Sequence, residues 1–176
     1  CSFCFIDFDN PKTFSGELNI LEIEKMTKNL GNTLLNVNFT GGEPFARKDI
    51  IDIAKLYIKN TTIQSIYVTT NGSLPDRILN FARDVSKFDD NIEINIQISI
   101  DDIPEKHDKV RKIKNLFENC ILSYRSLKDL RNSKINSSIS ITVTHENCDN
   151  IEKIFYHLTD TCKIDSLKCC IVRDEG

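Results

Sequence analysis

The first four residues, Cys-Ser-Phe-Cys, place two thiols three positions apart with an aromatic residue between them. Cys1 and Cys4 form a C-x-x-C pair, and Phe3 lies inside it. Thiolates at this spacing are ligands for zinc or for iron–sulfur clusters. The chemistry that this pair offers is therefore metal binding, and the rest of the sequence must indicate which metal.

A second group with chemical potential is the tetrapeptide Gly41-Gly42-Glu43-Pro44. Its two glycines let a backbone approach a ligand with no Cβ in the way, and a carboxylate beside them would suit an ammonium group. The same four residues could instead form a tight turn and a helix N-cap, with Glu43 exposed. Both interpretations stay open on the tetrapeptide alone. The Asn71-Gly72 pair is a weaker signal, because Asn-Gly is common in turns.

Composition indicates the setting in which these groups work. The 176 residues include seven cysteines, an odd number that fits poorly with a closed disulfide framework, and they contain no apolar leader and no apolar run of membrane-spanning length. We therefore expect a soluble protein of a reducing compartment, the cytoplasm. Acidic residues outnumber basic ones by 26 to 23, and the basic residues are scattered. This pattern argues against nucleic acid or a membrane as a partner.

The elements that must position these groups follow a rhythm of strand and helix. Strands are predicted at Asn36–Thr40, Ile66–Thr70, Glu93–Ile100, Ser138–Thr144 and Lys168–Val172. Helices are predicted at Leu21–Leu30, Asp49–Asn60, Pro75–Ser86, Val110–Leu130 and Asn150–Thr161. This alternation predicts an α/β domain with right-handed crossovers and a parallel sheet.

The strands have one apolar face each. In Glu93–Ile100, isoleucines alternate with polar residues, whereas a sheet covered by helices on both faces should be apolar on both. A partial barrel with parallel strands, helices outside and a polar lumen satisfies this pattern, since a full barrel needs about 250 residues. An antiparallel sheet with one wet face is the alternative. The side chains expected in the lumen are Asn38, Asn95, Gln97, Ser140 and Thr142.

These motifs together resemble the radical S-adenosylmethionine (radical SAM) enzymes, in the branch of the molybdenum-cofactor cyclase and the SPASM-type maturases. Cys1, Phe3 and Cys4 resemble the end of the family's C-x-x-x-C-x-aromatic-C motif. The segment 41–44 matches its GGEP motif, 70–72 resembles its TNG motif, and 99–111 resembles its S-x-D…HD…R stretch. The polar loops of the family follow successive strands in the same order.

This resemblance covers nearly the whole chain and implies a truncated, TIM-like (β/α)6 partial barrel, with residues 1–176 as its core domain. The first cluster cysteine and the first strand of the family would precede Cys1, and no C-terminal extension is expected here. Without the third cysteine, we expect the fragment by itself to be inactive.

The resemblance also implies an activity. A [4Fe–4S] cluster would reductively cleave S-adenosylmethionine, and the resulting 5′-deoxyadenosyl radical would abstract hydrogen from a substrate. That substrate would be a peptide or a small molecule, as in peptide or protein maturation or cofactor biosynthesis. A flavodoxin or ferredoxin would supply electrons.

The metal and methionyl ends of the site follow from the same resemblance. It implies Cys1 and Cys4 as cluster ligands, with Phe3 next to the adenine. It implies that Gly41, Gly42 and Glu43 receive the methionyl ammonium, while Pro44 shapes the turn.

Further cofactor contacts are implied at the ends of later strands. Ser99 would lie near the ribose or the methionyl group, and Arg111 would pair with the methionyl carboxylate, a bidentate task that suits guanidinium. Thr70, Asn71 and Asp101 would line the same mouth. Asp101 could equally cap the turn that follows it.

Two other functions compete with this one. A zinc-binding or scaffold module could use the Cys1 and Cys4 pair with Cys169 and Cys170. The His107-Asp108 dipeptide is typical of HD-type metal phosphohydrolases, which need further His and Asp ligands. A sequence with three histidines is poor in such ligands.

Overall fold

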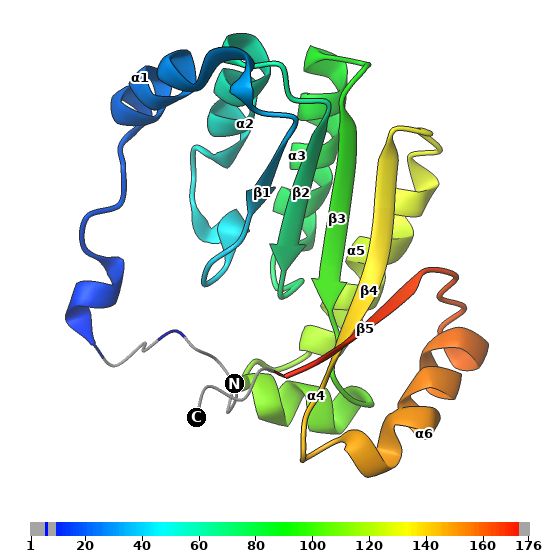
Figure 1. Ribbon diagram of the computed structural model, residues 1–176. Coiled ribbons are helices and arrows are strands. Elements are labelled where there is room, and N and C mark those ends of the chain that lie inside the picture. Colours follow the sequence, from blue (N-terminus) through cyan, green and yellow to red (C-terminus); the bar gives the residue numbers. More distant parts are fainter. Residues whose placement is uncertain (1–5, 7–9, 173–176) are drawn as a thin grey trace.

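The computed structural model describes residue 6 and residues 10–172 (Figure 1). Within these residues, five parallel strands form one sheet in the order β1-β2-β3-β4-β5. The strands are β1 (Asn36–Phe39), β2 (Ser65–Thr70), β3 (Glu93–Ser99), β4 (Ile135–Val143) and β5 (Leu167–Ile171). Each strand therefore pairs with the next one along the chain, which confirms the predicted parallel α/β architecture and excludes the antiparallel alternative.

The helices follow from this strand order. They are α1 (Ile20–Leu30), α2 (Ile50–Asn60), α3 (Pro75–Phe88), α4 (Pro104–Arg111), α5 (Leu116–Asp129) and α6 (Ile151–Tyr156). Parallel crossovers are right-handed, so a strand order that never reverses sends every crossover to the same face. Figure 1 shows α2, α3 and α5 behind the sheet, and α1 packs against α2.

The two faces of the sheet differ as the alternation predicted. Ile94, Ile96 and Ile98 of β3 are at most 1% exposed and belong to the core between sheet and helices. Asn95 and Gln97 point to the opposite face and are half-buried. Each fully buried isoleucine contributes roughly 1.5–3 kcal/mol to folding. The core therefore holds the helices on one side and leaves the other side polar.

Among the residues that the structure describes, the sheet is open at both edges. Within the described residues, β1 and β5 form the two edge strands and do not pair with each other. Figure 1 shows β5 running at an inclination to β1, which is the cumulative twist expected of parallel strands. This arrangement agrees with the partial barrel that the sequence predicted.

The helix predicted over Val110–Leu130 was wrong, because two helices occupy this region. Lys112 ends α4 in the left-handed conformation with φ 57°, and Asn115 precedes α5 with φ 58°. The Asp108 carboxylate then accepts a hydrogen bond from the backbone N–H of Phe117, at 2.8 Å. A capping group supplied by the preceding helix stabilises the start of α5, and helical periodicity alone does not reveal it.

Two other boundaries also differ from the predictions. β4 begins at Ile135 instead of Ser138, because pairing with β3 extends it through the polar Asn136. The last predicted helix, Asn150–Thr161, is α-helical only as far as Tyr156, and a π-helical turn completes it. Strand pairing and local helix geometry both depend on neighbours that are distant in sequence.

Gly72 is a position where the fold requires glycine. Its φ is +77°, and a Cβ there would lie 2.5 Å from the Cys120 sulfur and 3.2 Å from the Cys120 Cα. We expect Gly72→Ala to lower the free energy of unfolding by about 2–3 kcal/mol through overpacking and backbone strain. Urea denaturation measures this loss.

Gly16→Ala is the matched control, because Gly16 has φ +83° and a Cβ there would meet nothing within 4 Å. Its free energy of unfolding should fall only by the cost of the backbone strain, roughly 1 kcal/mol. Adding Cys120→Ala to Gly72→Ala should restore part of the stability that Gly72→Ala loses beyond Gly16→Ala, because the clashing sulfur is then absent. Equal losses at the two glycines would contradict the packing argument.

Candidate functional site

The carboxyl ends of the strands gather the predicted motifs at one end of the sheet. Parallel strands all finish at the same edge, so the loops after β1, β2, β3 and β4 become neighbours there. The arrowheads in Figure 1 show this common end. Segment 41–44 follows β1, segment 70–72 begins with the last residue of β2, and segment 99–111 runs from the end of β3 through α4. Hydrogen bonds join the first segment to the second.

Glu43 is the residue that makes this first connection. One carboxylate oxygen accepts hydrogen bonds from the Thr70 hydroxyl at 2.7 Å and from the Phe45 backbone N–H at 3.1 Å. The other accepts the backbone N–H of Asn71 at 2.7 Å. The predicted alternative, an exposed Glu43, was therefore wrong. The carboxylate does cap a short 3₁₀ turn, Pro44–Ala46.

The charge of Glu43 is only partly compensated. Burial raises the pKa of its carboxyl, although the hydrogen bonds from Asn71, Thr70 and Phe45 and the charge of Arg111 all act to lower it. A carboxylate whose desolvation outweighs its hydrogen bonds gains stability from a nearby cation. A cation placed beside Glu43 would therefore offset part of this desolvation.

The loop that carries Glu43 is fixed on both sides. Gly41 has φ +125°, a conformation that side chains rarely adopt. Pro44 is buried, and Phe45 is fully buried and meets the Phe81 ring edge-to-face at 5.5 Å. Sequence reasoning missed Phe45 as the anchor, and an aromatic residue directly after the motif was the available signal.

Asp101 and Arg111 form the second pair at this end of the sheet. Arg111 Nε and Nη2 both donate to Asp101 Oδ2, at 2.9 and 2.5 Å. The two side chains are 14% and 3% exposed. Asp101 therefore holds Arg111 and does not serve as a simple turn cap. It stays a prediction that Asp101, Arg111 and Ser99, the last residue of β3, contact a cofactor.

The histidine and aspartate of the HD pair have structural partners. His107 is fully buried, and its Nδ1 accepts the backbone N–H of Asp101 at 3.2 Å. Burial lowers the pKa of His107 to about 4, so the imidazole is neutral at physiological pH. Asp108 caps α5. Neither side chain is placed as a ligand of a phosphohydrolase metal site.

Metal sites are absent from the part of the chain that the structure describes. No group of three or more His, Cys, Asp or Glu side chains there could hold a metal ion. Cys169 and Cys170 are exposed neighbours on β5, and adjacent strand residues point to opposite faces. Cys1, Phe3 and Cys4 lie outside the described residues, so their assignment as cluster ligands and adenine neighbour stays a prediction.

Cys120 lies beneath the site and is not reactive. Burial raises the pKa of its thiol to about 12, and the thiol donates to the backbone oxygen of Asn71 at 3.2 Å. A thiol that stays protonated is neither a nucleophile nor a metal ligand. Its role is to support the loop after β2 from the α5 side.

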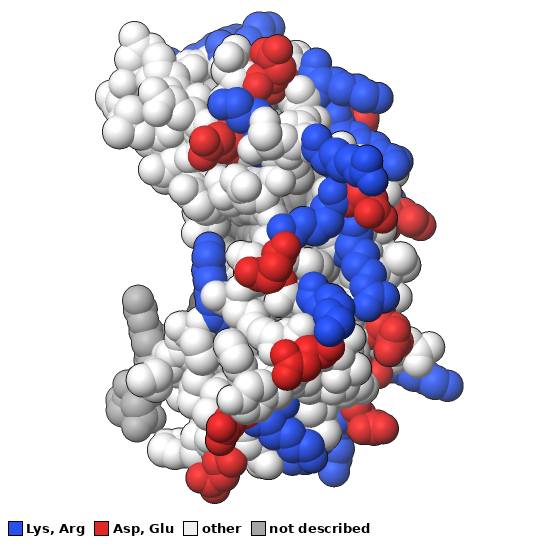
Figure 2. Space-filling model, turned by 90° about the vertical axis from the view of Figure 1, so that its right-hand side faces the viewer, with Lys and Arg blue, Asp and Glu red and all other residues white. Residues whose placement is uncertain are grey.

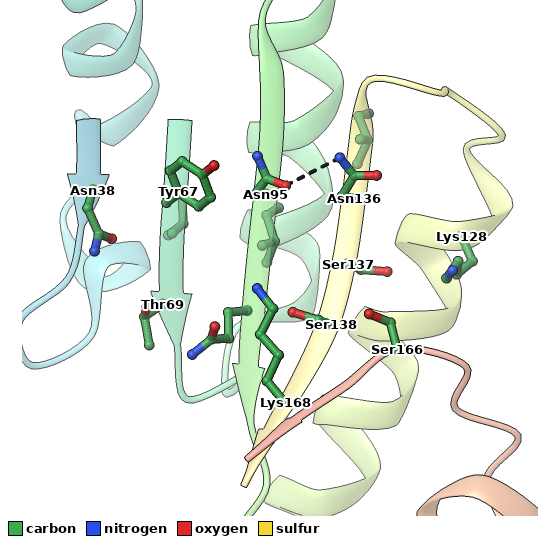
Figure 3. Close-up of a pocket in the computed structure, with 14 residues that line it drawn as sticks. Asn38, Tyr67, Thr69, Asn95, Lys128, Asn136, Ser137, Ser138, Ser166 and Lys168 are labelled. Atoms are coloured by element: carbon green, nitrogen blue, oxygen red, sulfur yellow. Dashed lines mark hydrogen bonds between the residues drawn. The ribbon is translucent and has the colours of Figure 1, made fainter. Parts of the chain in front are cut away.

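The polar face of the sheet forms a pocket of about 380 Å³ (Figure 3). Asn38, Tyr67, Asn95 and Asn136 lie in register across four strands. Asn136 donates to Asn95 at 3.3 Å, and Figure 3 shows Lys168 extending over this face from β5. No carboxylate is among the described lining residues.

The predicted lumen is therefore present, with a partly different lining. Asn38, Asn95 and Gln97 line the pocket as predicted, whereas Ser140 and Thr142 are not among its lining residues. Ser140 is only 4% exposed. Tyr67 and Lys168 line the pocket and were not predicted, because their positions depend on the register of β2 and β5.

Charges are distributed unevenly around the molecule. Figure 2 shows Lys and Arg interspersed with Asp and Glu over the helical side, while the side of the open sheet face is hollowed and mostly uncharged. Of the helices in the described part of the chain, none has the length and apolarity to cross a membrane.

Comparison with known proteins gives consistent matches. Residues 1–156 match the family model of the Radical SAM superfamily. The GTP 3′,8-cyclase of Cronobacter sakazakii is 34% identical over 108 residues, which cover 58% of this chain and 30% of the cyclase. The same-named enzyme of Haemophilus ducreyi is 30% identical over 97 residues, covering 54% and 28%. The matched region thus spans less than a third of either cyclase.

Solved structures share the fold. Native anSMEcpe with bound AdoMet superposes with a TM-score of 0.72 at 18% identity, covering 99% of this chain and 48% of that one. Native anSMEcpe with bound AdoMet and Kp18Cys peptide gives 0.71, with the same identity and coverage. At this identity the likeness shows the fold, and it agrees with the partial barrel.

The neutral, buried His107 predicts a specific pH dependence of stability. The unfolded histidine binds a proton near pH 6.5, whereas the folded one does so only near pH 4. The contribution of neutral His107 to the free energy of unfolding is therefore fully present above pH 6.5. It falls by up to about 3 kcal/mol as the pH drops from 6.5 to about 4. Urea unfolding at pH 7 and pH 4.5 measures the loss.

His107→Gln should reduce this acid sensitivity, because glutamine can still accept the Asp101 N–H but does not titrate. His145→Gln is the control, since His145 is exposed. If His107→Gln and the wild-type protein lost stability equally between the two pH values, the assigned protonation state would be wrong.

Proposed function

The chain belongs to the radical SAM superfamily, and we propose that residues 1–176 form the core domain that binds S-adenosylmethionine between Glu43 and Arg111 and cleaves it reductively. The family uses a [4Fe–4S] cluster and S-adenosylmethionine. The observation that carries the proposal is a carboxylate and a guanidinium, both fixed at the carboxyl end of the sheet. The methionyl end of the cofactor is a zwitterion with the complementary charges.

The acidic half of this receptor suits an ammonium group. Glu43 is held by three hydrogen bonds, yet its burial still raises its pKa. Binding an ammonium there would offset the desolvation of the carboxylate. The glycines at 41 and 42 are exposed and carry no side chain, so backbone groups beside Glu43 can approach the same ligand.

The basic half suits a carboxylate. Arg111 is only 14% exposed and is aligned by Asp101. A guanidinium presents five N–H donors in a rigid fork, a geometry that matches a carboxylate. Ser99 and Asn71 lie at the adjoining strand ends and would provide polar groups for the rest of the cofactor, whereas Thr70 is 2% exposed and its hydroxyl supports Glu43.

The cluster would be held by Cys1 and Cys4 together with a third thiolate. When bound, the cluster supplies the electron that cleaves the sulfonium and gives the 5′-deoxyadenosyl radical for hydrogen abstraction. The residues of this chain then have three tasks. They orient the cofactor by its methionyl end, shield the site from water through the buried loop around Phe45, and present the substrate over the polar sheet face.

The polar pocket indicates where the substrate lies. Its described lining offers amides, hydroxyls and Lys168 but no carboxylate, which favours a polar substrate that is neutral or anionic. Among the relatives, the cyclases are named for GTP, and one anSMEcpe structure holds the bound Kp18Cys peptide. We infer a peptide or a small polar molecule as substrate, a flavodoxin or ferredoxin as reductant, and the cytoplasm as the setting that keeps such a cluster reduced.

The decisive test is the formation of 5′-deoxyadenosine. The protein in its natural extent is reconstituted anaerobically with iron and sulfide, reduced with dithionite in the presence of S-adenosylmethionine, and analysed by chromatography. We expect 5′-deoxyadenosine from the wild-type protein and none from Cys4→Ala. Cys148→Ala, at an exposed cysteine away from the motif, is the matched control and should behave like wild type.

Glu43 offers a second test, which separates its charge from its hydrogen bonds. We expect Glu43→Gln to weaken S-adenosylmethionine binding by about tenfold to a hundredfold, because a charge-assisted contact is worth roughly 1.5–3 kcal/mol. Anaerobic titration calorimetry measures the affinity. An analogue that lacks the amino group should bind wild type and Glu43→Gln almost equally.

Thr70→Val is the control for loop integrity, because it removes one hydrogen bond to Glu43 and keeps the charge. It should weaken binding less than Glu43→Gln does. An unchanged affinity in Glu43→Gln would rule out Glu43 as the ammonium receptor. Both proteins would then lose the same amount of affinity for the analogue that lacks the amino group.

A further inference from the structure

Asn147 lies in the loop after β4 and is only 4% exposed. Its side-chain amide donates to the backbone oxygens of Asp101 at 2.8 Å and Thr142 at 2.9 Å. Its side-chain oxygen accepts the Thr144 backbone N–H at 2.7 Å. Both amide hydrogens and the carbonyl are therefore used, which fixes the orientation of this side chain.

These bonds hold the strand ends together beyond the point where β3 and β4 cease to pair. The last paired residues are Ser99 and Ser140. Further on, the two backbone groups of Thr142 are bound by side chains: its N–H donates to Asp101 Oδ1 at 3.1 Å, and its oxygen accepts from Asn147. Side chains thus replace ladder hydrogen bonds at the edge where the site begins.

Asp101 is consequently held at four atoms. Its N–H donates to His107, its backbone oxygen accepts from Asn147, and its Oδ1 accepts from Thr142. The remaining oxygen, Oδ2, binds Arg111. Since Asp101 is held at its backbone and at its carboxylate, the groups behind it fix the oxygen to which the Arg111 guanidinium donates.

We propose that Asn147 is a positioning residue that, through Asp101, sets the Arg111 guanidinium in the geometry required to bind the carboxylate of S-adenosylmethionine. This inference rests on the proposed function of Arg111. Asn147 does not touch the cofactor in this scheme. A misplacement of about 1 Å in a binding group can cost as much as a hundredfold in rate, so a change at Asn147 should reach the cofactor site.

Asn147→Asp is the sharpest variant, because it keeps the size of the side chain and replaces the donating NH2 with an oxygen that cannot donate when ionised. It removes the bonds to Asp101 and Thr142 and leaves the acceptor for Thr144. We expect S-adenosylmethionine binding, measured by anaerobic calorimetry on the reconstituted protein in its natural extent, to weaken about tenfold.

A second readout does not require the cofactor. The Arg111 Nε–H signal in a ¹H–¹⁵N NMR spectrum, assigned by its loss in Arg111→Lys, reports the bond to Asp101. We expect this proton to exchange slowly with solvent in the wild-type protein and faster, with a shifted resonance, in Asn147→Asp. A merely structural role for the loop would lower the melting temperature and leave this signal in place.

Asn150→Ala is the matched control, because it changes an amide three positions later whose side chain makes no capping hydrogen bond to α6. It should leave the affinity and the Arg111 signal unchanged. If Asn147→Asp does not fold, Asn147→Ser, which retains a single donor, replaces it and should show the same changes in smaller measure.

The outcomes separate this inference from the proposed function. The inference is wrong if the Asn147 variant matches wild type in both the Arg111 signal and the cofactor affinity. It is also wrong if the variant loses stability while the Arg111 signal stays in place. If Arg111→Lys leaves the cofactor affinity unchanged, the proposed role of Arg111 fails. The proposed effect of Asn147 on cofactor binding then fails as well, whether or not the Arg111 signal changes in Asn147→Asp.

Discussion

A strand order that follows the chain without reversal is the constraint on which the rest of this structure depends. Because each crossover between parallel strands is right-handed, the order β1-β2-β3-β4-β5 places the crossover helices on one face. The opposite face then has no helix to pack against and carries asparagine, glutamine, serine and tyrosine side chains. The polar pocket is thus a consequence of topology.

The same constraint brings the site together. Every strand ends at one edge, so loops that are far apart in sequence meet there. Two carboxylates join these loops, half-buried Glu43 and buried Asp101. Glu43 joins the loops after β1 and β2. Asp101 joins the end of β3 to β4 and to α4. Buried carboxylates are costly unless they are satisfied, and satisfying these two fixes the loops that carry them.

Burial also gives similar groups different tasks at this edge. His107 and Cys120 are both buried, which keeps the imidazole neutral and the thiol protonated. They support the loops after β3 and β2 and take no charge. Glu43 and Arg111 carry opposite charges instead, and the proposed function assigns them to the two charged groups of a zwitterionic ligand.

The sequence by itself determined the fold class and the identity of the main motifs. Alternation of period two in Glu93–Ile100 depends only on neighbouring residues, and it correctly predicted one apolar and one polar face. The spacing of GGEP and of the later polar loops likewise indicated the family, which the match over residues 1–156 confirmed.

Only the tertiary structure decided which side chains form hydrogen bonds with one another. Asn147 and Asp101 are 46 positions apart, and Glu43 and Thr70 are 27 apart. No local periodicity encodes such pairs, because they exist only once the strands are in register. The break between α4 and α5 has a related cause, since Asp108 supplies the cap that lets α5 start anew. Local patterns thus specify the elements, while register and burial specify the contacts between them.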